Sequence, residues 1–198
     1  MRLTLLSCTI LVAGSVLLSS TGHAQQSNRQ GAYFSGNIGV LKPNETPVTY
    51  NGYSGHISYD PGLLLTGAIG AYLGPSLRME LELGYSNAKY NTVTLGGRSA
   101  YLGGNINMYS ALAGVYIDLP ETGSMTPYVG GGAGAVNWID SASSGTDFAM
   151  FGEIGLAFRI SQSMSFVPSV RYIHLNNSNE IKGNDTAWAG KLGLRVNF

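Results

Sequence analysis

Residues 77–85 read Leu-Arg-Met-Glu-Leu-Glu-Leu-Gly-Tyr, a strict alternation of apolar residues with charged or small ones. Successive side chains of a β-strand point to opposite faces, so this segment has one apolar face and one charged face. The same period of two runs through residues 148–160 and through the last eight residues, 191–198. This pattern predicts strands whose outer and inner surroundings differ sharply in polarity.

Eight segments carry this alternation, and each is long enough for a tilted membrane strand of about 9–11 residues. They are residues 31–41, 62–73, 77–88, 106–118, 127–137, 148–160, 164–175 and 187–198. The connections alternate between long (42–61, 89–105, 138–147, 176–186) and shorter (74–76, 119–126, 161–163). Long loops on one side and short turns on the other are typical of outer-membrane barrels. The sequence therefore predicts an all-β fold, an eight-stranded antiparallel up-and-down transmembrane β-barrel with both termini on the periplasmic side.

The first 24 residues have the features of an export signal. A short positive start, Met1-Arg2, precedes an apolar run from Leu3 to Leu18, and small residues follow up to Ala24. The apolar run is too short for a spanning helix, which needs about 20 residues. We therefore predict a signal peptide at residues 1–24 and a barrel at residues 25–198. The only cysteine, Cys8, lies in the segment predicted to be removed.

Composition excludes several functional classes. The chain has 11 Lys and Arg against 11 Asp and Glu among its 198 residues, so no basic surface is predicted for nucleic acid. One cysteine excludes a disulfide scaffold, and His56 and His174, the histidines outside the predicted signal, are too few for a convincing metal site. No cofactor is therefore expected.

Aromatic residues gather near the ends of the predicted strands, as they do at membrane interfaces. Those near short turns are Tyr33, Phe34, Tyr72, Tyr116, Tyr128, Phe158, Phe166 and Phe198, and those near long loops are Tyr85, Tyr109, Trp138, Tyr172 and Trp188. The sequence predicts that they form two belts. A rival interpretation is a soluble periplasmic barrel with inverted faces, in which Leu81, Leu83, Ile154 and Phe158 would lie inside.

The chain resembles the small eight-stranded barrels of the opacity type and of the outer-membrane-protein-A-like type. Thr126-Pro-Tyr-Val-Gly-Gly-Gly-Ala-Gly134 is similar to their fifth strand, and Arg171-Tyr172 is similar to their seventh. The end of the chain, with Lys191, Gly193, Val196 and Phe198, is similar to the terminal signal that the outer-membrane assembly machinery reads in this family. The resemblance implies a monomer in the outer membrane of a Gram-negative bacterium, in contact with its lipid.

If the apolar faces meet lipid, the charged faces line a narrow lumen. The residues predicted to form an ion-pair network there are Arg78, Glu80, Glu82, Asp118, Glu153, Arg159, Arg171, Lys191 and Arg195. An eight-stranded barrel is only wide enough to be filled by side chains, so these charges must pair. Gly130, Gly132 and Gly134 fall on the inward face and are expected to leave room for long arginine side chains.

Two functions follow from these patterns. We expect a non-enzymatic surface protein, envelope-structural or adhesive, with four long extracellular loops. Two roles are open for the loop aromatics Tyr50, Tyr53, Tyr59 and Tyr101: packing within the loops, which we favour, or contact with a host or surface ligand. The alternative is a hydrolase, because residues 171–177 resemble the motif of outer-membrane lipid A deacylases and would place His174 on the lipid side. Position 176 is Asn where that motif has Ser, so His174 lacks a nearby hydroxyl to activate. No catalytic residue is therefore expected.

Overall fold

The computed structural model describes residues 31–50, 52–101, 103–140, 144–176 and 185–198, so the predicted signal peptide lies outside the described residues. Eight strands form the wall of a closed barrel. They are β1 (Gly31–Pro43), β4 (Gly62–Tyr72), β5 (Leu77–Leu95), β7 (Asn105–Asp118), β8 (Met125–Ile139), β9 (Ser144–Arg159), β10 (Met164–Asn176) and β11 (Asp185–Asn197). Within the described residues, no helix is long and apolar enough to cross a membrane.

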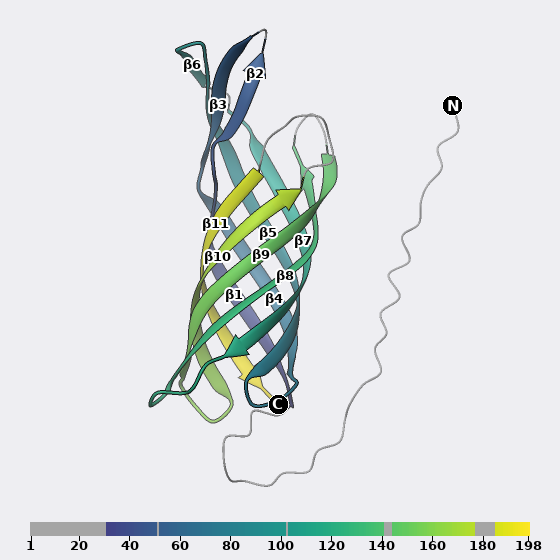
Figure 1. Ribbon diagram of the computed structural model, residues 1–198, viewed down its shortest axis with the longest axis vertical. Helices are drawn as coiled ribbons and strands as arrows, with labels where there is room; N and C mark the ends of the chain where they lie inside the picture. Colours follow the sequence, from purple (N-terminus) through teal and green to yellow (C-terminus); the bar gives the residue numbers. More distant parts are fainter. Residues whose placement is uncertain (1–30, 51, 102, 141–143, 177–184) are drawn as a thin grey trace, which may run out of the picture.

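The barrel closes where the first and last strands pair (Figure 1). β1 runs antiparallel to β11 from Tyr33 opposite Asn197 to Pro43 opposite Ala187. On the other side of the molecule β5 pairs with both β4 and β7, which completes the ring. Closure satisfies the backbone groups of every wall strand inside the protein, which is the condition for placing strands in lipid. The predicted eight-stranded antiparallel barrel is confirmed.

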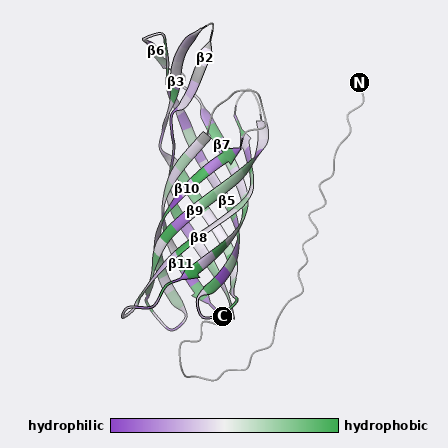
Figure 2. Cartoon of the chain, viewed as in Figure 1, coloured by the Kyte–Doolittle hydropathy of each residue, from purple (hydrophilic) through white to green (hydrophobic). Residues whose placement is uncertain are grey.

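The two faces of each strand lie as the alternation predicts. On β5, Leu81 and Leu83 are 64% and 70% exposed on the outer wall, whereas Glu80 and Glu82 are 8% and 4% exposed inside. Figure 2 shows hydrophobic and hydrophilic residues alternating along the wall strands. The soluble barrel with inverted faces is therefore wrong, since its supposed core residues Leu81, Leu83 and Ile154 all lie outside.

The loops at one end contain more β-structure than the sequence predicted. The segment 42–61 contains β2 (Thr46–Tyr50) and β3 (Tyr53–Asp60), and β5 continues to Leu95 before pairing with β6 (Arg98–Tyr101). Gly96 and Gly97 have φ angles of 55° and 78°, a conformation that other residues adopt reluctantly and that makes the tight β5–β6 turn possible. β2, β3, β6 and the end of β5 form an extension that rises beyond the barrel (Figure 1).

Pairs of aromatic rings mark both ends of the outer wall. Phe34 packs near Phe198, and Phe158 near Phe166, close to the short turns. The pairs Tyr85–Tyr109 and Tyr172–Trp188 lie toward the long loops.

Five of the predicted belt residues point the other way. Tyr33, Tyr116 and Tyr128 are 0%, 2% and 4% exposed and lie in the lumen, because their positions have inward parity. Tyr72 has the same parity and packs against Tyr33, and Trp138 donates to the buried Asp147. Their place in a belt was therefore wrong.

The outer wall generates a stability prediction. Leu81→Arg places a charge on the lipid-facing side and should reduce the free energy of unfolding in phospholipid vesicles by about 2–4 kcal/mol. The matched control is Ala100→Arg, on exposed β6 outside the barrel, which should change it by less than about 0.5 kcal/mol. Urea titration followed by tryptophan fluorescence measures both. Equal effects of the two substitutions would contradict the membrane assignment of the wall.

Candidate functional site

The charged side chains of the lumen form two clusters. The lower cluster, around Arg78, lies toward the short turns, and the upper cluster, around Arg171, lies toward the long loops. The centre of the lower cluster, Arg78, is fully buried. Arg78 donates from Nε to Asp118 Oδ1 at 3.0 Å and from Nη1 to Glu80 Oε1 at 2.5 Å. The hydroxyl of Tyr33 donates to the same Glu80 oxygen at 2.6 Å, and Arg195 Nη2 lies 3.9 Å from it. Each carboxylate in this cluster therefore has a cation beside it.

The upper cluster is built around Arg171, which is 2% exposed. Its guanidinium donates to both oxygens of Glu82, at 2.5 and 3.1 Å, and from Nε to Glu153 at 2.6 Å. Lys191 Nζ bridges the same two carboxylates, at 2.8 Å from Glu153 and 3.4 Å from Glu82. Tyr128 adds a hydroxyl bond to Glu153 at 2.9 Å. Five strands, β5, β8, β9, β10 and β11, are thereby joined through the centre of the barrel.

Aromatic rings fill the space between the two clusters. The Cζ of Arg78 lies 4.1 Å from the centre of the Tyr116 ring, and that of Arg171 lies 4.1 Å from the centre of the Phe151 ring. Such cation–ring stacking compensates buried guanidinium groups. The space above Gly130 was expected to receive an arginine. It is taken by the Tyr116 ring, which a Cβ on Gly130 would strike.

One residue of the predicted network lies elsewhere. Arg159, predicted to point into the lumen, has a 43% exposed side chain and pairs with Glu121 at the short-turn rim. It is the last residue of β9, where the inward face already lies beyond the lumen. Its inclusion in the network was wrong. The eight others are all buried and number four cations (Arg78, Arg171, Lys191, Arg195) and four anions (Glu80, Glu82, Asp118, Glu153). Their formal charges cancel.

Above the upper cluster, the lumen changes character and contains a cavity of about 320 Å³. Glu82 and Arg171 form its floor, and the cavity extends to the long-loop rim at Thr46, Tyr59 and Asp140. Much of its wall is apolar, and the apolar residues that line it include Leu41, Leu64, Met108, Leu112, Val136, Ile173 and Leu175. The hydroxyl groups of Thr66, Ser86 and Ser110 stand among them. This apolar region was not predicted from the sequence, although Leu63-Leu64-Leu65 breaks the alternation and puts leucine on both faces of β4.

A buried carboxylate faces this cavity near its rim. Asp147 lines the cavity, is 7% exposed, and accepts a hydrogen bond from Trp138 Nε1 at 2.9 Å. Within the described part of the chain it forms no salt bridge, which sets it apart from the carboxylates of the two clusters.

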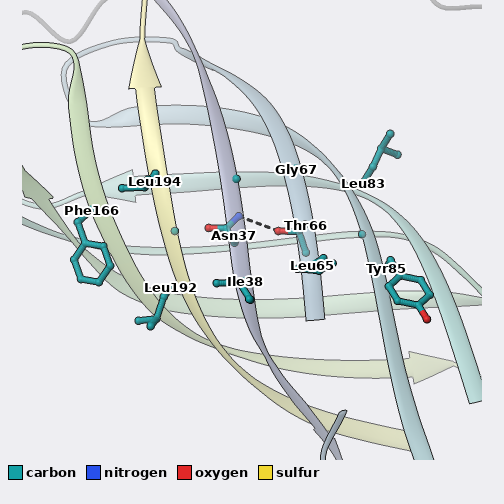
Figure 3. A pocket seen from close by; sticks show the side chains of 13 residues that line it. Asn37, Ile38, Leu65, Thr66, Gly67, Leu83, Tyr85, Phe166, Leu192 and Leu194 are labelled. Atoms are coloured by element: carbon teal, nitrogen blue, oxygen red, sulfur yellow. Dashed lines mark hydrogen bonds between the residues drawn. The ribbon is translucent and has the colours of Figure 1, made fainter. Parts of the chain in front are cut away.

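A second hollow lies on the outer wall, where β1, β4, β5, β10 and β11 present small residues between large ones (Figure 3). A Cβ on Gly36 or Gly67 would meet open space. Asn37 and Thr66 belong to the same stretch of wall but have inward parity; Asn37 donates to Thr66 at 2.8 Å, and Thr66 donates to Glu82 in the lumen. The hollow therefore offers apolar surface and no reactive group.

The remaining predicted residues lie apart from the lumen clusters. His174 is half-buried on β10, opposite Met150 and Thr186, and forms no hydrogen bond or ion pair with any described residue. In the terminal strand Lys191 and Gly193 face inward, whereas Val196 and Phe198 face outward. Among the residues that the structure describes, no group of three His, Cys, Asp or Glu side chains has metal-binding geometry.

Comparison with known proteins identifies the family. The profile of the outer membrane protein beta-barrel domain matches residues 10–198, so the chain belongs to this family. It is a β-barrel protein of the Gram-negative outer membrane, as the sequence predicted. Uncharacterized proteins of Brucella abortus and Brucella melitensis are 25% identical over 69% of this chain. The chain spans about 61% of the length of these relatives.

Two solved structures share the fold. Neisserial surface protein A superimposes with a TM-score of 0.63 and 16% identity, covering 85% of this chain and 97% of that one. The outer membrane protein OprG from Pseudomonas aeruginosa gives a TM-score of 0.64 and 15% identity, covering 86% and 97%. At these identities the likeness is one of fold.

The two clusters generate a second prediction. Glu153→Leu leaves Arg171 and Lys191 short of a buried partner and should lower the free energy of unfolding by about 3–5 kcal/mol. The control is Glu121→Leu, which breaks the surface pair with Arg159 and should cost no more than about 1 kcal/mol. Adding Lys191→Met to Glu153→Leu should recover part of the loss. Urea unfolding in vesicles tests all three, and equal losses for Glu153→Leu and Glu121→Leu would contradict a buried network.

Proposed function

We propose that this protein is a non-enzymatic surface barrel that holds a β-structured extension outside the cell for contact with a host or surface ligand. The observation that carries the proposal is the continuity of β5, which runs for 19 residues from the barrel wall into the extension. β3 pairs with its upper part from Gly55 opposite Leu95 to Asp60 opposite Lys89. A paired extension costs little conformational entropy on binding, unlike a flexible loop.

The extension presents large side chains to solvent. Tyr53 and Tyr101 are 63% and 77% exposed, and the four residues of β6 are all exposed. Tyrosine supplies both apolar area and a hydroxyl at protein interfaces and is enriched there. This composition supports contact with another macromolecule, with the barrel as a rigid anchor and with outer-membrane lipid around its wall.

The orientation follows from the family architecture. In bacterial outer-membrane barrels the short turns face the periplasm and the longer loops face outward. We therefore propose that the extension and the cavity rim face the exterior, and that a single chain acts as the functional unit.

Cysteine labelling on intact cells tests the orientation. In a Cys8→Ser background, Ala100→Cys on β6 should react with a membrane-impermeant maleimide, whereas Gln162→Cys in the β9–β10 turn should react only after the outer membrane is opened. Both positions are exposed in the folded chain, so intrinsic accessibility is matched. Labelling of Gln162→Cys alone on intact cells would mean that the barrel is inverted and would remove the basis for surface contact.

The hydrolase alternative would need His174 to activate a hydroxyl. The described residues give His174 no hydrogen-bonding partner, and residue 178, the nearest serine of the same parity, lies outside them. We therefore treat His174 as a residue of the membrane interface, close to the Tyr172–Trp188 pair. Ester hydrolysis by the purified barrel that His174→Ala abolishes would reverse this assignment.

We further propose that the terminal residues Lys191, Gly193, Val196 and Phe198 are read by the outer-membrane assembly machinery. Phe198 follows the end of β11, and its amide donates to Ala32 O at 3.0 Å. Its ring is 68% exposed and lies 5.3 Å from that of Phe34. These few contacts make Phe198 a minor contributor to the finished barrel, so a large effect in cells would have to arise during assembly.

Deletion of Phe198 separates the two roles. The loss of one aromatic side chain should cost the folded barrel at most about 1.5–3 kcal/mol, so the variant should still refold from urea into detergent. In cells its yield in the outer membrane should fall far more, because an unassembled barrel has unpaired strand edges and aggregates. Resistance to unfolding in cold detergent, read on a gel, measures folded protein in both settings. Equal yields of variant and wild type in cells would contradict the assembly role.

A further inference from the structure

We propose that the apolar cavity at the long-loop end of the lumen is a binding site for a small organic cation, an amine whose charged group sits beside Asp147 and whose apolar body fills the space below. Nothing in the surface-contact function requires this cavity. Its volume of about 320 Å³ lies at the lower end of the range for small-molecule sites, roughly 300–1,000 Å³.

The apolar lining is the first observation. The interior of an outer-membrane barrel is ordinarily polar, because its outer face contacts lipid and its inner face contacts water or charged side chains. Here two buried apolar groups, one containing Leu112 and Val136 and the other Leu41 and Leu64, both pack against Met108 and Ile173. The empty space therefore has a large apolar surface, interrupted by a few hydroxyl groups, that an apolar molecule would cover.

The charges around the cavity are the second observation. Its lining contains carboxylates on Glu82, Asp140 and Asp147 and one described cation, on Arg171. Glu82 and Arg171 neutralise one another in the floor, and Asp140 has an interaction of its own. Asp147 is the lining carboxylate to which the described residues give no cation, and its charge favours a positive ligand over a negative one.

Asp147 marks where the positive group would lie. Burying a carboxylate is costly unless a cation or several hydrogen bonds compensate it. Asp147 is only 7% exposed. Its one hydrogen bond to a described residue comes from the neutral indole N–H of Trp138. An ammonium group in the cavity would supply the missing charge.

Aromatic side chains at the rim suit the same ligand. Tyr59, Tyr90 and Trp138 line the upper part of the cavity. Faces of aromatic rings attract organic cations, and tryptophan does so most strongly. An aromatic rim, a buried carboxylate and an apolar body together match a molecule that is charged at one end and apolar at the other.

Binding to the full barrel in phosphatidylcholine nanodiscs tests the proposal, with 2-phenylethylamine as the probe and 2-phenylethanol as its neutral analogue. The chain has two tryptophans, so in a Trp188→Phe background the emission of Trp138 reports on the cavity. The amine should bind saturably and at least tenfold more tightly than the alcohol. Empty nanodiscs give the partition background, and a zwitterionic lipid avoids a net negative membrane charge.

Three variants locate the site. Asp147→Asn keeps an oxygen for Trp138 and should weaken the amine at least tenfold while leaving the alcohol unchanged. Glu45→Gln removes an exposed carboxylate at the same end of the barrel, outside the cavity lining, and should alter neither affinity more than twofold. Leu112→Phe enlarges a side chain of the cavity wall without adding a tryptophan and should weaken the binding of both.

Three results would overturn the proposal, and the first two can be measured without substituting any residue of the lumen. They are the absence of a saturable response to the amine, equal affinity for amine and alcohol, and an amine affinity that Asp147→Asn leaves unchanged. Cold-detergent gel mobility verifies that each variant is folded. Because the probe is a small amine, failure here leaves the surface-contact function of the extension untouched.

Discussion

The mutual neutralisation of eight buried charges is the constraint on which the rest of this barrel depends. Side chains fill the lower lumen of this eight-stranded barrel and leave no room there for bulk water, so each of these eight charges must find its partner within the protein. Arg171 alone reaches Glu82 on β5 and Glu153 on β9. These bonds across the lumen fix how far apart opposite walls stand, and the rings of Tyr116 and Phe151 occupy the space that remains.

The period of two in the sequence was enough to predict the wall, because a slip of one residue would turn Glu80 and Glu82 into the lipid and Leu81 into the lumen. Parity alone does not give a residue's height along the barrel axis. That is why Arg159, correctly inward by parity, proved to lie at the rim. Tyr33, Tyr116 and Tyr128 failed in the opposite way, since their height suggested a belt while their parity placed them inside.

The partners in the ion pairs and the apolar upper lumen could not be predicted from the sequence, each for a different reason. Alternation gives each residue's face but not which strands stand opposite, so the contact of Lys191 with both Glu82 and Glu153 could not be read from spacing. In the sequence, the inward Leu64 stands between two outward leucines. A run of this kind indicates an apolar strand and does not reveal that the inward side chain lines a cavity. The extension was missed because β2, β3 and β6 are only 5, 8 and 4 residues long and gain their stability from pairing with one another and with the end of β5.

The two halves of the lumen limit what the protein can do with a ligand. The floor of the cavity is the Glu82–Arg171 pair, held from below by Lys191 and Glu153, so a molecule entering at the rim meets a closed end. Passage along the axis would require separating buried ion pairs, each of which costs several kcal/mol to break. A cavity that is open at one end only must take up and release its ligand through that end. The architecture therefore favours binding at the surface over transport through the lumen, which agrees with a barrel whose exposed extension stands beside that opening.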